Sequence, residues 1–193
     1  MGLISLIVGG ALDANKAIKQ NRAKNDDTVQ TVTVKNLYSI DVPSYLSPTT
    51  KLSEDASLQY INRTLDIAFQ VIDESKAELI NEIKELKEAF PNVDFGDDDE
   101  LLILIATFAL NSMFEDISKV EIYDYTETTI NGMNAITLNA FQPRTFWKDA
   151  MYVSFGFIEG KKTLYQIAIL SGGTSIGKLG EKLEKAIKSF REL

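Results

Sequence analysis

Carboxylates are the side chains with which this sequence could perform acid–base chemistry, because its 193 residues include no histidine and no cysteine. Glu54 and Asp55 are adjacent acids, and together with Asp66 and Asp73 they could supply a general acid and a general base. No spacing sets two of these four acids opposite each other, so the surface of an acidic domain explains them more simply. Without histidine and cysteine, Ser-His-Asp and Cys-His catalysis are excluded, as are zinc and haem sites built on those ligands.

The glycine-rich stretch from Gly172 to Lys178 has the spacing of a phosphate-binding P-loop, in which backbone N–H groups and a lysine hold phosphates. The next residue is Leu179, where magnesium coordination calls for Ser or Thr. The preceding strand is also predicted to belong to a hairpin, whereas a P-loop follows a parallel strand. We therefore interpret the stretch as a turn in which Thr174 or Ser175 caps the last helix.

Asp94 and the run from Asp97 to Glu100 are a candidate calcium site, since calcium prefers several carboxylate ligands. Their spacing differs from that of an EF-hand loop, which needs ligands at alternate positions and a final glutamate. Acids at the start of a helix are favourable without any metal. The sequence therefore predicts no metal site, no cofactor and no catalytic residue, and the protein is expected not to be an enzyme.

Four aromatic residues are the candidate surface for a protein partner: Trp147, Tyr152, Tyr123 and Tyr125. They fall on predicted strands, and alternate side chains of a strand point to opposite faces, so some of the four must face away from the core. Exposed aromatic residues are enriched at protein interfaces. Cross-strand packing is the alternative explanation for the same residues.

Periodicity predicts the elements that position these residues. Alternating and apolar runs predict strands over 29–35, 38–42, 56–62, 65–72, 120–128, 133–141, 147–158 and 163–170. Asn131 and Gly132 form the strongest short hairpin signal, because both tolerate positive φ. Helices are expected over 73–90, 98–115 and 174–193. Hairpin-linked strands with helices segregated against them predict an α+β domain with an antiparallel sheet of about seven strands.

The last predicted helix has a clear apolar side. Its stripe consists of Ile176, Leu179, Leu183, Ala186, Ile187 and Phe190. Glu181 with Lys185, and Glu184 with Lys188, are expected to form i,i+4 ion pairs on the solvent side. This helix is therefore expected to cover one face of the sheet.

Residues 1–28 are predicted to be an apolar and basic N-terminal segment with a linker, followed by a single domain over 29–193. The apolar run 1–12 is too short to span a bilayer, which takes about 20 residues, and it lacks the basic start of a signal peptide. It could instead tether the chain to an anionic membrane surface or to a partner through Leu3, Ile4, Ile7 and Val8. A docked helix, a subunit contact and a frayed terminus are the alternatives. With no cysteine for lipidation, the expected location is the cytoplasm or the membrane periphery.

Short stretches of the chain, taken in their order and spacing, resemble the PsbP-like superfamily. This group includes the photosystem II subunit PsbP, the envelope protein DcrB and a Ran-binding nucleotide-release factor. The stretches are Tyr38 to Pro43, Ala56 to Tyr60, Ile130 to Ala135, Glu159-Gly160 with Tyr165 to Ile167, and Glu184 with Ser189-Phe190. The resemblance covers about residues 36–192. It implies an α/β/α sandwich around an antiparallel sheet and a role in assembly, stabilisation or partner binding, with no shared catalytic residues.

The net charge of −8, from 20 basic against 28 acidic residues, argues against nucleic-acid binding, which needs clustered Lys and Arg. We therefore expect a non-catalytic bacterial PsbP-like domain that binds an unidentified protein partner or assists assembly. The alternative is a small-molecule-binding domain or a carboxylate-dependent hydrolase with a pocket between the sheet and the helices.

Overall fold

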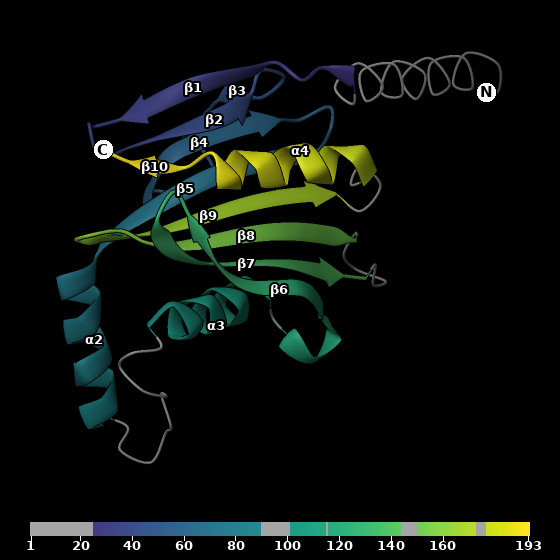
Figure 1. Ribbon diagram of the computed structural model, residues 1–193. Coiled ribbons are helices and arrows are strands. Elements are labelled where there is room, and N and C mark those ends of the chain that lie inside the picture. Colours follow the sequence, from purple (N-terminus) through teal and green to yellow (C-terminus); the bar gives the residue numbers. More distant parts are fainter. Residues whose placement is uncertain (1–24, 90–100, 115, 144–149, 173–176) are drawn as a thin grey trace.

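The computed structural model describes residues 25–89, 101–114, 116–143, 150–172 and 177–193 (Figure 1). The strands are β1 (Val29–Val34), β2 (Tyr38–Pro43), β3 (Ser47–Pro48), β4 (Ala56–Asn62), β5 (Ile67–Ser75), β6 (Glu121–Ile130), β7 (Met133–Gln142), β8 (Met151–Glu159), β9 (Thr163–Gly172) and β10 (Arg191–Glu192). The helices are α2 (Lys76–Ala89), α3 (Leu101–Met113) and α4 (Gly177–Lys188), and a short 3-10 helix, η2 (Ile117–Lys119), precedes β6. Every run predicted to be a strand or a helix overlaps one of these elements.

Seven strands form one antiparallel sheet in the order β3-β4-β5-β9-β8-β7-β6, so β3 and β6 are its edges. The turn between β6 and β7 is made by Asn131 and Gly132, whose φ angles are 49° and 84°. Positive φ at both positions gives a type I′ turn, which matches the right-handed twist of the strands on either side. The predicted α+β fold with an antiparallel sheet of about seven strands is confirmed.

β1 and β2 do not join this sheet but pair with β10 in a separate three-stranded antiparallel sheet, in the order β1-β2-β10. Arg191 pairs with Ser39, and Glu192 pairs with Tyr38. The prediction of a helix over 174–193 is therefore wrong at its end, because the last residues form a strand instead of a further helical turn.

Phe190 explains why α4 ends early. Its ring is fully buried, with its centroid 5.1 Å from that of Tyr38 and 4.7 Å from that of Tyr165. Beside it, the Ser189 hydroxyl accepts a hydrogen bond from the backbone N–H of Asp41 at 2.8 Å, which ties the end of the helix to β2. Burial of a large aromatic side chain contributes more than one additional helical turn would. The chain therefore leaves the helix to place Phe190 in the core.

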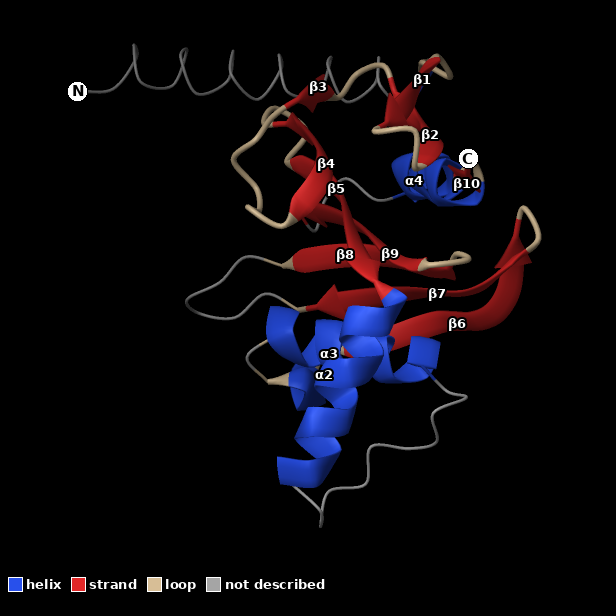
Figure 2. Ribbon diagram, turned by 90° about the vertical axis from the view of Figure 1, so that its left-hand side faces the viewer, coloured by secondary structure: helices blue, strands red, loops and turns tan. Residues whose placement is uncertain are grey.

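Different elements cover the two faces of the seven-stranded sheet: α3 lies on one face, and α4 and the small sheet lie on the other (Figure 2). α3 packs on β7 and β8, and α4 lies on the other face between β8 and β2. Each face has its own buried cluster. The cluster under α4 includes Tyr38, Phe69, Ile167, Leu183, Ile187 and Phe190, and the one under α3 includes Ile105, Leu110, Leu138, Phe155 and Phe157. This layering is the α/β/α arrangement that the resemblance implies.

The helix predicted from Asp73 begins three residues later, at Lys76, because β5 continues through that interval. The residues of the interval pair with β9: Asp73 with Tyr165, Glu74 with Leu164 and Ser75 with Thr163. Ser75 then caps α2, since its hydroxyl accepts a hydrogen bond from the backbone N–H of Glu78 at 3.4 Å. Pairing with β9 satisfies backbone groups that a helix starting at Asp73 would leave free at its first turn.

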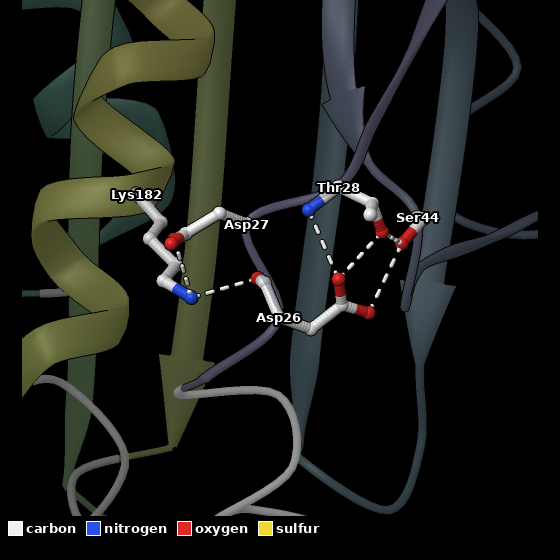
Figure 3. Close-up of polar contacts among 5 residues, drawn as sticks. All are labelled: Asp26, Asp27, Thr28, Ser44 and Lys182. Carbon is white, nitrogen blue, oxygen red and sulfur yellow. Dashed lines mark hydrogen bonds and ion pairs between the residues drawn. The ribbon is translucent and has the colours of Figure 1, made fainter.

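Residues just before β1 contact the domain through a small polar cluster (Figure 3). The Asp26 carboxylate accepts hydrogen bonds from the backbone N–H and hydroxyl of Thr28, at 2.9 and 2.5 Å, and from the Ser44 hydroxyl at 3.2 Å. These bonds, with the Thr28 hydroxyl as the largest cause, lower the pKa of Asp26. Lys182 of α4 donates to the backbone oxygen of Asp26 at 2.7 Å and lies 2.9 Å from Oδ1 of Asp27. Part of the predicted linker thus lies against the domain, and the boundary at residue 28 stays a prediction.

Candidate functional site

A groove of about 240 Å³ lies between α4 and the strands β6, β7 and β8. On the sheet side, Thr126 pairs with Thr137, and Asn139 pairs with Ser154. Side chains at paired positions point to the same face, so these polar groups form the floor of the groove. Asp124 and Thr128 also line it from β6, and Glu184, Ile187 and Lys188 line it from α4.

Asn139 is the centre of a hydrogen-bond network in this groove. Its side chain is buried, and its Oδ1 atom accepts a hydrogen bond from the Ser154 hydroxyl at 2.6 Å. Its Nδ2 atom donates to Oδ2 of Asp124 at 3.4 Å and to Oε1 of Glu184 at 3.3 Å. Two carboxylates from different elements therefore meet at one amide in the groove.

A β-bulge directs Asp124 into the groove. The register of β6 against β7 shifts between Tyr123 and Thr126, and Asp124 has a φ of 53°. Aspartate tolerates this left-handed conformation better than most residues. Consecutive residues of a regular strand point to opposite faces, but here Tyr123 and Asp124 both contact residues on the α4 face. The extra residue therefore adds a carboxylate next to the tyrosine on the α4 face of β6.

Two of the four aromatic residues predicted to form a partner surface meet beside this groove. Tyr123 and Tyr152 are in edge-to-face contact, with ring centroids 5.6 Å apart. Burial raises the pKa of Tyr152, and the charge of Glu184 raises it further. The Tyr123 hydroxyl is buried and has no hydrogen-bond partner in the described part of the chain. The pair thus extends the polar groove with two partly covered aromatic rings.

Tyr125 lies on the opposite face of β6. Its hydroxyl donates to Oε1 of Glu127 at 3.1 Å, and Glu127 pairs with Ile136, which is buried under α3. Tyr125 is 47% exposed and shares no surface with the Tyr123–Tyr152 pair. Trp147 falls outside the described residues, as do the tether residues Leu3, Ile4, Ile7 and Val8.

Of the acids selected from the sequence, Asp55 comes near Asp73, because their neighbours Ala56 and Ile72 are paired across β4 and β5. Asp66 and Asp73 lie at opposite ends of β5, about 23 Å apart along an extended strand. Glu54 and Asp55 are exposed in the loop before β4. The calcium candidates, Asp94 and 97–100, fall outside the described residues, and elsewhere in the described structure no three acids are placed to hold a metal ion.

The stretch from Gly172 to Lys178 does not follow the kind of strand that a P-loop needs. It comes after β9, which runs antiparallel to both of its neighbours, β5 and β8. Residues 173–176 themselves are outside the described ranges. The antiparallel arrangement favours the interpretation of this stretch as a turn that leads into α4.

The residues that define the groove were not selected from the sequence. Asn139 and Ser154 each interrupt an apolar run in the sequence of a strand. A polar residue in such a run is a signal that could have identified both as candidate site residues. Glu184 was expected to pair with Lys188 on the solvent side, but its carboxylate accepts a hydrogen bond from Asn139 instead. Asp124 depends on a bulge that no local pattern predicts. Together these groups can bind a cationic or hydrogen-bond-donating group.

Comparisons with known proteins identify the fold. None of the described helices is long and apolar enough to cross a membrane. A scan against protein-family models and a search of curated proteins found no match to this chain. One similar solved structure is the Ran-binding protein Mog1p of Saccharomyces cerevisiae, with 13% identity and a TM-score of 0.57; the match covers 85% of this chain and 95% of that one. Another is the cyanobacterial PsbP of Synechocystis sp. PCC 6803, with 9% identity and a TM-score of 0.55; the match covers 86% of this chain and 94% of that one. The chain therefore has the PsbP/Mog1-like α+β fold that the short sequence stretches implied.

Proposed function

We propose that this chain is a non-catalytic domain that binds a protein partner in an assembly, and that the partner docks at the groove between α4 and β6. The observation that carries the proposal is the meeting of Asp124 and Glu184 at Asn139 in an open groove. The two carboxylates outnumber Lys188, the basic residue that lines the groove, and so favour a cationic or N–H-donating group supplied from outside the domain.

Three further observations support a binding role. The Tyr123–Tyr152 pair lies beside the groove, and tyrosines next to a polar recess are common anchors in protein interfaces. The whole sequence lacks histidine and cysteine, the residue types on which much hydrolytic and nucleophilic catalysis depends. The fold is also that of a Ran-binding protein, so a protein partner is among its known uses.

Affinity capture followed by reconstitution tests this function. A protein captured by the full chain would be purified and titrated calorimetrically against the wild type, Asp124→Asn and Glu184→Gln. Each groove variant is expected to bind about tenfold more weakly, because a charge-assisted hydrogen bond is lost while the shape of the side chain is kept. Glu181→Gln is the matched control, since Glu181 is exposed on the same helix. Equal affinity for all four proteins would rule out the groove as the docking site.

The groove also favours a second candidate, the binding of a small polar molecule. Its volume of about 240 Å³ and its threonine, serine and asparagine groups suit a compact ligand that carries hydroxyl or amine groups. Drug-sized ligands occupy pockets of about 300–1,000 Å³, so the ligand would be smaller than these. Titration with small polyols and amines, followed by the NMR signal of the Asn139 side-chain amide, tests this candidate. No shift of that signal with any compound would eliminate it.

A further inference from the structure

We propose that β6 is a docking edge at which an extended, basic segment of the partner protein adds as another strand, with a lysine or arginine side chain entering the groove. The inference rests on the partner-binding function proposed above and specifies the charge and the backbone conformation of the partner.

β6 offers an open backbone edge. It is the outer strand of the seven-stranded sheet, and eight of its ten residues are exposed. Within the described ranges, no other strand pairs with its outer side. The unpaired N–H and C=O groups of a long edge strand are a template for an added strand.

The two-residue turn between β6 and β7 determines which backbone groups point outward. In such a hairpin the pair next to the turn, here Ile130 and Met133, is hydrogen-bonded, and hydrogen-bonded pairs alternate along the ladder. Thr129 and Glu127 therefore belong to the non-hydrogen-bonded pairs that lie between the hydrogen-bonded ones. Their N–H and C=O groups point away from β7. The register is regular over this part of β6, on the turn side of the bulge.

The negative charge of β6 determines what kind of partner strand can pair with it. The charged residues of β6 are Glu121, Asp124 and Glu127, and neither β6 nor β7 contains a lysine or an arginine. A second copy of this chain would set acids against acids along the edge, which destabilises a strand pair. A basic segment gains opposite-charge pairs at the same positions.

The groove gives one basic side chain a defined place. Thr126 and Thr128 belong to β6 and line the groove, so they mark the face of the edge that looks toward α4. A side chain of the added strand on this face lies about 5 Å from the threonine that it opposes. A lysine or arginine there extends over the threonine hydroxyls and brings its charge to Asp124 and Glu184.

A defined pair of peptides tests strand addition. The probe is the peptide acetyl-Lys-Val-Lys-Thr-Lys-Val-Lys-amide, and the control is acetyl-Lys-Pro-Lys-Pro-Lys-Pro-Lys-amide, which has the same charge but cannot form a strand ladder. We expect the probe to bind at least tenfold more tightly and to slow hydrogen exchange of the outward N–H groups of Glu127 and Thr129. Equal affinity of the two peptides, or protection only at residues outside β6, would overturn the proposal.

Variants of the full chain give an independent measurement. Thr129→Pro removes one outward N–H group that β7 does not use, and it is expected to weaken probe binding at least tenfold. Thr129→Val keeps the N–H group and should bind within twofold of the wild type. Circular dichroism checks that Thr129→Pro is folded; if it is not, the peptide pair and hydrogen exchange decide the question on the wild-type protein.

The outcomes separate this inference from the function on which it rests. If a captured partner loses affinity for Asp124→Asn and Glu184→Gln but binds Thr129→Pro as it binds the wild type, the groove is a docking site and strand addition is wrong. If neither groove variant changes the affinity, both proposals fail. A dimer that forms through β6, detected by sedimentation equilibrium and broken by Thr129→Pro, would overturn the choice of a basic partner.

Discussion

Gly156 of β8 lies directly beneath Ile187 of α4, and a Cβ atom at position 156 would come within 2.4 Å of the Cγ2 atom of Ile187. The absence of a side chain on Gly156 therefore sets how closely α4 approaches the sheet. Ile187 also lines the groove, so the same contact fixes the distance between the helix and the groove floor.

Gly156→Ala is expected to destabilise the domain by about 1–3 kcal/mol, the usual cost of overpacking a core. Urea unfolding of the purified protein measures this free energy. Ile187→Ala removes the clashing methyl group at its own cost of about 2–5 kcal/mol. The double variant should therefore lose less stability than the sum of the two single variants. Additive losses would show that α4 does not rest on this contact.

Phe190→Ala is expected to cost about 3–5 kcal/mol, because it empties a fully buried position between Tyr38 and Tyr165. The matched control is Leu193→Ala, since Leu193 is 62% exposed and a surface change of this kind usually stays within about 0.5 kcal/mol. Thermal and urea unfolding of both variants check the difference. Similar midpoints for the two proteins would contradict the packing of Phe190 as the anchor of the last residues.

Tyr45 is expected to make the fold sensitive to alkaline pH. Burial raises the pKa of its hydroxyl to about 12, with the charge of Asp26 as the second cause, and the hydroxyl has no hydrogen-bond partner among the described residues. The ordinary value is about 10, so the folded state favours the neutral phenol, and this stability is present below pH 10 and lost as the pH rises toward 12.

Tyr45→Phe should therefore be at least as stable as the wild type at neutral pH, where no hydrogen bond is lost, and more stable at about pH 11. Urea unfolding of both proteins at the two pH values measures the difference between them. A difference that stays constant with pH would show that the Tyr45 hydroxyl ionises equally well in the folded and unfolded states.

The N-terminal segment carries a separate proposal, that residues 1–12 contact an anionic membrane surface. The full chain is expected to float with vesicles that contain anionic lipid, and a chain that begins at Asn25 is not. Replacing Leu3, Ile4, Ile7 and Val8 with serine should abolish flotation, and added salt should weaken it. Equal flotation of the full and shortened chains would contradict a membrane contact made by residues 1–12.

Much of the fold is predictable because its signals are local. Asn131 and Gly132 specify the turn between β6 and β7 without reference to the rest of the molecule, and the stripe through Leu183 and Ile187 predicts the buried side of α4. The end of α4 is not predictable in this way. Phe190 leaves the helix because Tyr38 and Tyr165 bury it, and those residues are distant in the sequence.

The candidate site is predictable only in part. The sequence identifies Tyr123 and Tyr152 as aromatic residues on strands, and the two are in contact. Strand alternation would place Tyr125 on the same face as Tyr123, whereas the structure places it on the opposite face. The bulge at Asp124 changes which residues share a face, and its position depends on the pairing with β7. Asn139 gains its role only when α4 brings Glu184 to it across the sheet.

The pairing of β2 with β10 has a consequence for biosynthesis. β2 is made early, yet one of its two partner strands and an aromatic ring that packs on Tyr38 are in residues 190–192. Contacts so distant in sequence fold slowly, and no ordering of events during translation can supply them before those residues have left the ribosome. Until then a nascent chain lacks two of the groups that cover β2, the strand β10 and the ring of Phe190.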